Sequence, residues 1–282
     1  MFQEIEPREL HIEYMEREPE ADDFVICIKD RQILVRAGSE ELELPYVAEI
    51  RPLVKDGYLR YLFRIDDMAF FALMDQDPEA PEGFGYVPVR DIRSMKPTWM
   101  VYALYLGNRL DLWYDETRYC GHCGTPMVHS DRERAMKCPK CGKTEYPVIC
   151  PCVIVAIIDR KTNRLMCTRY SEKHMPGRRH GYALVAGYVE SGETPEQTVR
   201  REVMEEVGLR VKNIKYYKSQ PWPVSGSLLL GFICDLDGDP DAQPDGEELA
   251  AAEWKTSEEL ADLTEDISLT RELMLMFRDG KI

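Results

Sequence analysis

The sequence has no hydrophobic run long enough to cross a membrane. Among its 282 residues, no segment approaches the roughly 18 consecutive apolar residues that a membrane-spanning helix needs. The start of the chain, MFQEIEPREL, contains too many acids for a secretory signal peptide. Internal repeats and low-complexity linkers are also missing. We therefore expect a globular, cytoplasmic chain without a membrane partner and with room for more than one domain.

The sequence also lacks an excess of positive charge. Lys and Arg number 36 against 51 Asp and Glu, so the formal net charge is −15. A broad nucleic-acid surface needs a basic footprint, and this composition argues against one. A small anionic substrate remains compatible, because a metal ion and a few local cations are enough to hold it.

The cysteines do not form the even set that a disulfide framework requires. The chain has 9 of them, and an odd number favours a reducing compartment. Five are scattered among apolar residues and are typical of buried, reduced thiols: Cys27, Cys150, Cys152, Cys167 and Cys234. Cys150 and Cys152 have one residue between them and open an apolar run, which does not favour a redox or metal role.

The other four cysteines form two CxxC pairs, each followed by glycine. The pairs are Cys120/Cys123 in CGHCG and Cys138/Cys141 in CPKCG. Two such pairs joined by a short hairpin are typical of a closed four-thiolate site that holds one structural Zn²⁺. His122 and His129 are competing ligands, but four cysteines already complete the shell. A nucleic-acid-binding ribbon is disfavoured because acids and bases are nearly balanced around the pairs.

The ribbon separates two different patterns of secondary structure. Before it, FVICIKDRQILVRA predicts two strands, YLFRIDDMAFFALM continues the β-rich character, and GFGYVPVRDIRSM adds a short strand. KPTWMVYALYLGNRLDLWY predicts a helix that leads into the ribbon. Nothing in residues 1 to about 95 resembles a site. We expect an N-terminal α+β domain over 1–114, a zinc ribbon over 115–147 and a third domain over 148–282.

Strands and one helix are predicted after the ribbon. CVIVAIID and LMCTRY predict strands on either side of a polar turn, and YALVAG predicts a short strand. Thr194 begins a helix as its N-cap, Pro195 takes the first position, and Gln197 closes a capping box. Gly208 is the predicted terminator. The apolar stripe of this helix is Val199, Val203 and Val207.

The same helix crowds like charges together at Glu202, Glu205 and Glu206. Acidic helices often carry such groups as a solvated face, at a small cost in helix stability. The alternative is a cation site, in which a divalent metal offsets the repulsion. Carboxylates with water suit Mg²⁺ or Mn²⁺, and Arg201 is able to pair with a neighbouring carboxylate.

The order of residues around this helix resembles the Nudix box, G-x5-E-x7-R-E-U-x-E-E-x-G-U, where U is aliphatic. Every position is satisfied, by Gly187, Glu193, Arg201, Glu202, Val203, Glu205, Glu206, Gly208 and Leu209. The resemblance implies a Nudix hydrolase with an α/β/α sandwich. The preceding ribbon and the motif SQPWP at Ser219–Pro223 resemble the NADH pyrophosphatase subfamily, whose members also remove NAD caps from RNA.

The resemblance implies roles for individual residues. Glu202, Glu205 and Glu206 are the implied catalytic and metal-binding carboxylates, joined as metal ligands by Glu248 and the carbonyl of Ala186. The implied substrate contacts are Tyr146, Tyr188, Gln220, Pro221, Trp222, Pro223, Val224, Ser225, Gly226, Ser227 and Thr270. Among them, Tyr146 is expected to reach across a homodimer interface and Tyr188 to stack on the nicotinamide. Lys173, Arg178 and Arg179 are either phosphate contacts or a solvated loop.

The resemblance implies metal-dependent hydrolysis of NAD(H) to NMN(H) and AMP. Other candidate substrates are NAD-capped RNA 5′ ends and another nucleoside diphosphate derivative such as ADP-ribose. An alternative of another class is a non-catalytic zinc-ribbon adaptor with a Nudix shape. One departure bears on the substrate: the subfamily motif continues with phenylalanine and proline, where this chain has Val224 and Ser225.

Overall fold

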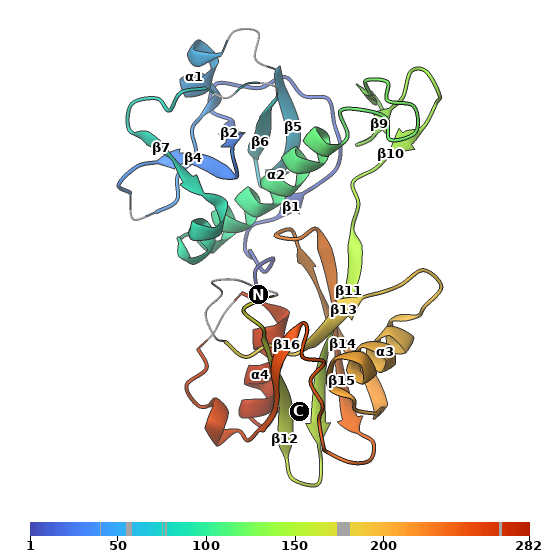
Figure 1. Cartoon of the computed structure of the whole chain (residues 1–282). Helices are drawn as coiled ribbons and strands as arrows, with labels where there is room; N and C mark the ends of the chain where they lie inside the picture. The colour runs from blue at the N-terminus through green and yellow to red at the C-terminus, as the bar shows by residue number, and fades with distance from the viewer. Residues whose placement is uncertain (40, 55–57, 75, 77, 174–180, 265–266) are drawn as a thin grey trace. The chain divides into compact units, whose positions relative to one another are not determined.

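The structure is a computed structural model that describes residues 1–282 except 40, 55–57, 75, 77, 174–180 and 265–266. The chain forms two compact units (Figure 1). The N-terminal unit consists of Phe2–Val148 and Pro223–Ser225, and the C-terminal unit of Met1, Ile149–Trp222 and Gly226–Ile282. In the described ranges, no helix has the length and apolar character to cross a membrane. The three-domain division stays a prediction.

Before the ribbon, the N-terminal unit contains one mixed sheet, one antiparallel sheet and one long helix. One sheet has the strand order β1-β5-β6-β2 and the other β3-β4-β7. The strands are β1 Leu10–His11, β2 Phe24–Ile26, β3 Ile28–Lys29, β4 Gln32–Arg36, β5 Tyr58–Ile65, β6 Met68–Met74 and β7 Phe84–Pro88. The helices are α1 Val47–Ile50, the 3-10 helices Arg51–Leu53 and Val89–Ser94, and α2 Thr98–Glu116.

The first predicted strand pair becomes three strands because the chain changes sheets. Phe24–Ile26 pairs with β6, whereas Ile28–Lys29 pairs with β4, so Cys27 marks the crossing between the sheets. The predicted helix before the ribbon is α2, which packs on β2, β5 and β6. At Gly107, an added Cβ would lie 2.1 Å from Cδ1 of Ile26, so a larger residue would require the end of the Ile26 side chain to move.

The zinc ribbon lies within the N-terminal unit as a small three-stranded sheet. Its order is β10-β9-β8, with β8 Val128–His129, β9 Met136–Lys137 and β10 Thr144–Glu145. Two contacts join it to the N-terminal segment: the Tyr14 hydroxyl donates to the Ser130 carbonyl at 2.8 Å, and Arg134 Nη2 donates to the Ile12 carbonyl at 3.1 Å.

The C-terminal unit is a mixed sheet covered by one helix on each face (Figure 1). The sheet order is β14-β15-β11-β12-β16, and β13 also pairs with β11. The strands are β11 Cys150–Asp159, β12 Arg164–Tyr170, β13 Val185–Tyr188, β14 Val211–Trp222, β15 Ser227–Leu236 and β16 Leu249–Lys255. The helices are α3 Pro195–Val207, the 3-10 helix Glu258–Leu260 and α4 Leu269–Arg278.

Strand β11 organises both faces of this sheet. Its side chains alternate: Ile154, Ala156 and Ile158 pack in the cluster that contains Leu273 of α4. Val153, Val155 and Ile157 pack instead in the cluster that contains Val199, Val203 and Val207 of α3. This alternation follows from the two-residue period of a strand and explains why the strand is apolar throughout. The predicted α/β fold class, with a Nudix-type sandwich and a ribbon, is confirmed.

Candidate active site and zinc ribbon

Helix α3 begins and ends where the local sequence predicts. The Thr194 side chain accepts a hydrogen bond from the Gln197 amide at 3.3 Å, and Gln197 Oε1 accepts one from the Thr194 amide at 2.8 Å. Gly208 ends the helix in the left-handed region with φ of 68°. Because α3 buries its valine stripe against the sheet, its glutamates must lie on the remaining faces.

The three helix glutamates lie in different environments. Glu206 is almost fully buried, with 6% of its surface exposed. The side chain of Glu202 is 13% exposed, whereas that of Glu205 is 58% exposed. The three crowded glutamates therefore do not form a single solvated face of the helix. Two of the carboxylates are withdrawn from water, which is costly for a charge without a partner.

Arg201 is the cation that links four residues of the site. Its guanidinium donates to both carboxylate oxygens of Glu193, at 2.8 and 2.9 Å, and to the Tyr188 carbonyl at 3.0 Å. It also donates to Glu202 at 2.7 Å and Glu205 at 2.9 Å. The Arg201 hydrogen bonds lower the pKa of Glu193 to about 2. The predicted pairing of loop and helix through Arg201 is present.

Among the residues that the structure describes, no cation forms an ion pair with Glu206. Burial, followed by the charges of Glu248 and Glu202, raises the pKa of Glu206 to about 8, opposed by a hydrogen bond from the Ala186 backbone. Burial also raises the pKa of Glu202 in spite of its bond to Arg201. Carboxylate oxygens that repel one another form a donor set that suits a hard divalent cation, and such a cation would offset the repulsion.

Gly187 is required by the close approach of strand β13 to helix α3. A Cβ added there would lie 1.9 Å from the carboxyl carbon of Glu202. Any side chain would displace this carboxylate, which explains the glycine at the start of the motif.

Asp245 is a site residue that the sequence reasoning missed. Its amide donates to the Glu206 carbonyl at 3.1 Å, and its Oδ1 accepts from the Glu248 amide at 3.2 Å and the Leu249 amide at 2.9 Å. Asp245 therefore ties the loop that carries Glu248 to the end of α3. A sequence signal was available, because Asp245-Gly246 is a typical turn pair before a strand, and Asp245 Oδ1 does accept from the Glu247 amide two residues later at 3.2 Å.

The predicted substrate residues do not all have the same exposure. Tyr188 is 51% exposed, and its hydroxyl lies 3.2 Å from Oγ of buried Ser227. Gln220 is fully buried: Nε2 donates to the Ile267 carbonyl at 2.8 Å, and Oε1 accepts from the Leu269 amide at 2.7 Å. Gln220 thus fixes the start of α4, where Thr270 lies in the first turn.

The remaining predicted contacts lie in the β14–β15 hairpin and in the ribbon. Pro221 and Trp222 end β14, Pro223–Gly226 form the turn, and Val224 is 44% exposed. Tyr146 is 53% exposed, and its hydroxyl donates to Glu133 at 3.3 Å. Lys173 is exposed. Arg178 and Arg179 lie outside the described residues.

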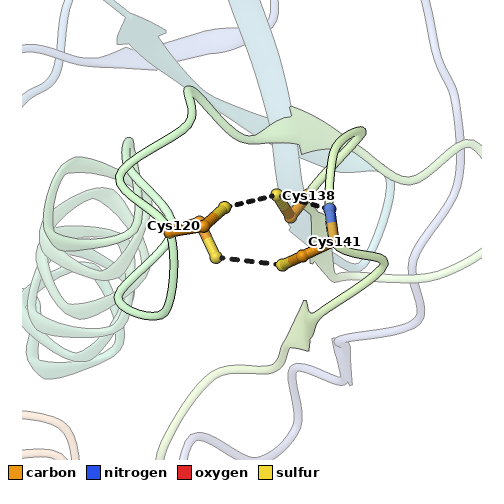
Figure 2. A group of neighbouring side chains, drawn as sticks. Cys120, Cys138 and Cys141 are labelled. Atoms are coloured by element: carbon orange, nitrogen blue, oxygen red, sulfur yellow. Dashed lines mark hydrogen bonds between the residues drawn. The ribbon is translucent and has the colours of Figure 1, made fainter.

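The four predicted zinc cysteines come together in the ribbon (Figure 2). Their Sγ atoms all lie within 4.8 Å of one another, with Cys120 to Cys141 at 3.6 Å and Cys123 to Cys138 at 3.5 Å. These separations fit a tetrahedron with Zn–S bonds of about 2.3 Å. Hydrogen bonds between Cys123 and Thr125 lower the pKa of the Cys123 thiol to about 6, which favours the thiolate.

The closed shell excludes the competing ligands from this group. Among the described residues, the four cysteines are the one set of three or more side chains whose ligand atoms are so close together, and neither His122 nor His129 belongs to it. The residues after each pair, Gly124 and Gly142, have φ of 69° and 77°. Glycine is therefore needed for the tight knuckle that the sequence predicted. The site is that of a structural zinc ion.

The two regions of the chain that carry these sites both match known protein families. Residues 149–275 match the NUDIX domain, and residues 115–146 match the NADH pyrophosphatase zinc ribbon domain. The NAD-capped RNA hydrolase NudC of Pseudomonas aeruginosa (strain LESB58) is 35% identical over 205 residues, which cover 72% of this chain and 70% of that protein. The protein of the same name from Klebsiella pneumoniae subsp. pneumoniae is 40% identical over 168 residues, covering 60% and 63%.

The fold and the acidic site on α3 thus define a hydrolase of the α/β/α sandwich type. The chain belongs to the Nudix hydrolase family and carries the zinc ribbon of NADH pyrophosphatases. It is a pyrophosphohydrolase, as predicted, and the comparisons give the alternative of a non-catalytic adaptor no support.

Proposed function

We propose that this chain hydrolyses the pyrophosphate bond of NAD(H), giving NMN(H) and AMP. The observation that carries the proposal is the buried Glu206, whose carboxyl has a pKa of about 8 because burial, Glu248 and Glu202 disfavour its charge. Such a group, in a chain that also carries a family-specific zinc ribbon, is typical of a site built for metal-dependent phosphoryl chemistry rather than for stability.

Glu202, Glu205, Glu206, Glu248 and the Ala186 carbonyl are the proposed ligands of Mg²⁺ or Mn²⁺. When bound, these ions neutralise phosphate oxygens and lower the pKa of a coordinated water. The match between these residues and a divalent cation rests on their chemistry, because they are oxygen ligands whose charges repel one another in the folded chain.

The carboxylates also provide the base for the reaction. Glu205 or Glu206 orients a water and takes its proton, the water oxygen bonds to one phosphorus, and the bond from that phosphorus to the bridging oxygen breaks. The leaving phosphate keeps the electron pair of that bond. Arg201 holds Glu202 and Glu205 in place by charge-assisted hydrogen bonds at 2.7 and 2.9 Å.

The dinucleotide is proposed to bind along Tyr188, Ser227, Thr270 and the segment Gln220–Gly226. Tyr188 is suited to stacking because half of its surface is exposed and its hydroxyl is fixed near Ser227. Gln220 acts by holding the start of α4 rather than through a free amide. Tyr146 is proposed to contact substrate across a homodimer interface. The cytoplasm is the proposed location of the enzyme.

NAD-capped RNA is the second candidate substrate. The relatives with 35% and 40% identity are named NAD-capped RNA hydrolases, and the cap contains the same pyrophosphate bond. The net charge of −15 disfavours extended RNA contacts, but cleavage at a cap needs few of them.

Product analysis with separate substrates tests this proposal. NADH, NAD⁺, NAD-capped RNA, ADP-ribose and diadenosine polyphosphates are each incubated with Mg²⁺ or Mn²⁺. AMP and NMNH appearing fastest from NADH support it, and faster cleavage of capped RNA selects the second candidate. Preference for ADP-ribose or a diadenosine polyphosphate would contradict both and direct attention to Val224 and Ser225.

A further inference from the structure

A cavity of about 380 Å³ lies in the N-terminal unit, far along the chain from the Nudix motif. Its walls are the extended segment Met15–Pro19, the first half of β5 at Tyr58–Tyr61, and Arg51 with Val54. The volume falls within the range of about 300–1,000 Å³ typical of small-molecule sites. No motif in residues 1 to about 95 predicted a site.

The wall of this cavity contains a buried cation. Arg60 is only 7% exposed, and its Nε has no hydrogen-bond partner. Its guanidinium carbon lies 4.7 Å from the centre of the Tyr58 ring. The charged guanidinium group also interacts with the Tyr14 hydroxyl. Within the described ranges, no carboxylate forms an ion pair with it. A buried guanidinium without a counter-charge is costly, so an anion in the cavity would relieve an existing penalty.

Two more guanidinium groups line the same cavity. Arg17 pairs with Asp23 at 3.0 Å, and Arg51 donates to a main-chain carbonyl at 3.3 Å, which leaves further donors on each planar group. The carboxylates in the lining are those of Glu16 and Glu18, and both residues are exposed. Arg17 is neutralised by ion pairs with Asp23 and Glu20, so Arg51 and Arg60 are the cations that the lining offers to an anion.

The chemistry of the lining favours a phosphate group with an attached ring. Guanidinium groups bind phosphate oxygens through parallel hydrogen bonds. Tyr58 is 49% exposed and offers an aromatic surface beside the buried cation. We propose that this cavity binds a small phosphorylated ligand of mononucleotide size, with Arg60 as the anchoring cation. Inorganic phosphate has the same anionic group as this ligand, but it has no ring that can stack on Tyr58.

Calorimetric titration of the full, zinc-loaded chain without Mg²⁺ or Mn²⁺ tests the proposal, with AMP and inorganic phosphate as probes. We expect saturable binding of AMP and weaker binding of phosphate. In Arg60→Met the affinity for AMP should fall at least about tenfold, because a charged hydrogen-bond donor is lost. Hydrolysis of NADH and the zinc content should be unchanged, which shows that the variant is folded.

Two exposed positions keep the test decisive if Arg60→Met does not fold. Arg51→Gln should weaken AMP binding, and Glu18→Gln should strengthen it about two- to fivefold, since an exposed charge contributes little more. Absence of saturable binding, or equal binding by wild type, Arg60→Met and Arg51→Gln, would overturn the proposal. So would AMP binding that is lost in Glu206→Gln but kept in Arg60→Met, because AMP would then occupy the Nudix site.

Discussion

The zinc ribbon and the acidic site on α3 are both clusters of metal-ligating side chains, but they differ in how they are held. In the ribbon, four thiol groups already face one another, with sulfur atoms as close as 3.5 and 3.6 Å. On α3, Arg201 binds both Glu202 and Glu205, whereas Glu206 is buried among like charges.

This difference corresponds to the two uses of a metal in proteins. A closed tetrahedral shell leaves no position for substrate and stabilises the fold. A set of carboxylates that repel one another keeps positions for water and phosphate oxygens and stores some unfavourable free energy in the folded chain. The first cluster should therefore fail by unfolding, and the second by losing turnover without unfolding.

The largest expected effect is the loss of zinc. Cys138→Ala removes one thiolate from the shell, and structural zinc binding in small domains is worth about 10–16 kcal/mol. We expect the variant to contain no zinc and to lose the structure of the ribbon, measured by metal analysis and by amide hydrogen exchange over residues 115–147. Cys150→Ser is the matched control, because Cys150 lies outside the four-sulfur group. Full zinc content in Cys138→Ala would contradict the closed site.

The second effect is on catalysis. Glu206→Gln keeps the shape of the buried side chain but removes its charge, and kcat should fall by about 10²–10⁴-fold, the size expected for loss of a catalytic acid–base group. Steady-state hydrolysis of NADH with Mg²⁺ or Mn²⁺ measures the change. Glu196→Gln, on an exposed position in the first turn of the same helix, should keep full activity. Similar rates for both variants would remove the α3 carboxylates from the mechanism.

The third effect links the acidic site to pH. Because the folded pKa of Glu206 is raised from 4.5 to about 8, its ionisation favours the unfolded chain. The resulting loss of stability begins as the pH rises above the unfolded value and is complete above pH 8. With zinc retained and Mg²⁺ and Mn²⁺ omitted, wild type should lose melting temperature relative to Glu206→Gln between pH 5 and about 8.5.

The comparison with Glu206→Gln isolates the effect of this carboxyl together with its repulsion of Glu202 and Glu248. Mg²⁺ or Mn²⁺ should reduce the difference at high pH, because bound metal stabilises the ionised form. A pH-independent difference between the two proteins would show that the Glu206 carboxyl is not perturbed by folding.

Local patterns in the sequence were sufficient for the framework of both clusters. The two CxxC pairs with their glycines, and the capping of α3 at Thr194 and Gly208, depend on residues close together in the chain. Such short-range spacing predicts a knuckle or a helix without knowledge of the rest of the fold.

The properties that depend on distant residues could not be predicted. The pKa of Glu206 is set partly by Glu248, which reaches it through the Asp245 turn. Gln220 was assigned to substrate, but its amide is occupied by the start of α4. Arg60 occurs in the strand sequence YLRYLFRI, where an arginine predicts an exposed face, and only the packing of segments far away in the sequence buries it.

The smallest expected effect concerns substrate preference at Val224. This residue is 44% exposed in the turn between β14 and β15, where the related motif has phenylalanine. Restoring the aromatic in Val224→Phe should lower KM for NADH, because stacking on a base is worth roughly 1–3 kcal/mol. Val224→Leu is the matched control, since it enlarges the side chain without an aromatic face, and the melting temperature of both should stay near that of wild type. Equal KM values for the two variants would mean that this turn does not contact the base. The preference of the enzyme for its substrate would then be set by residues outside the turn.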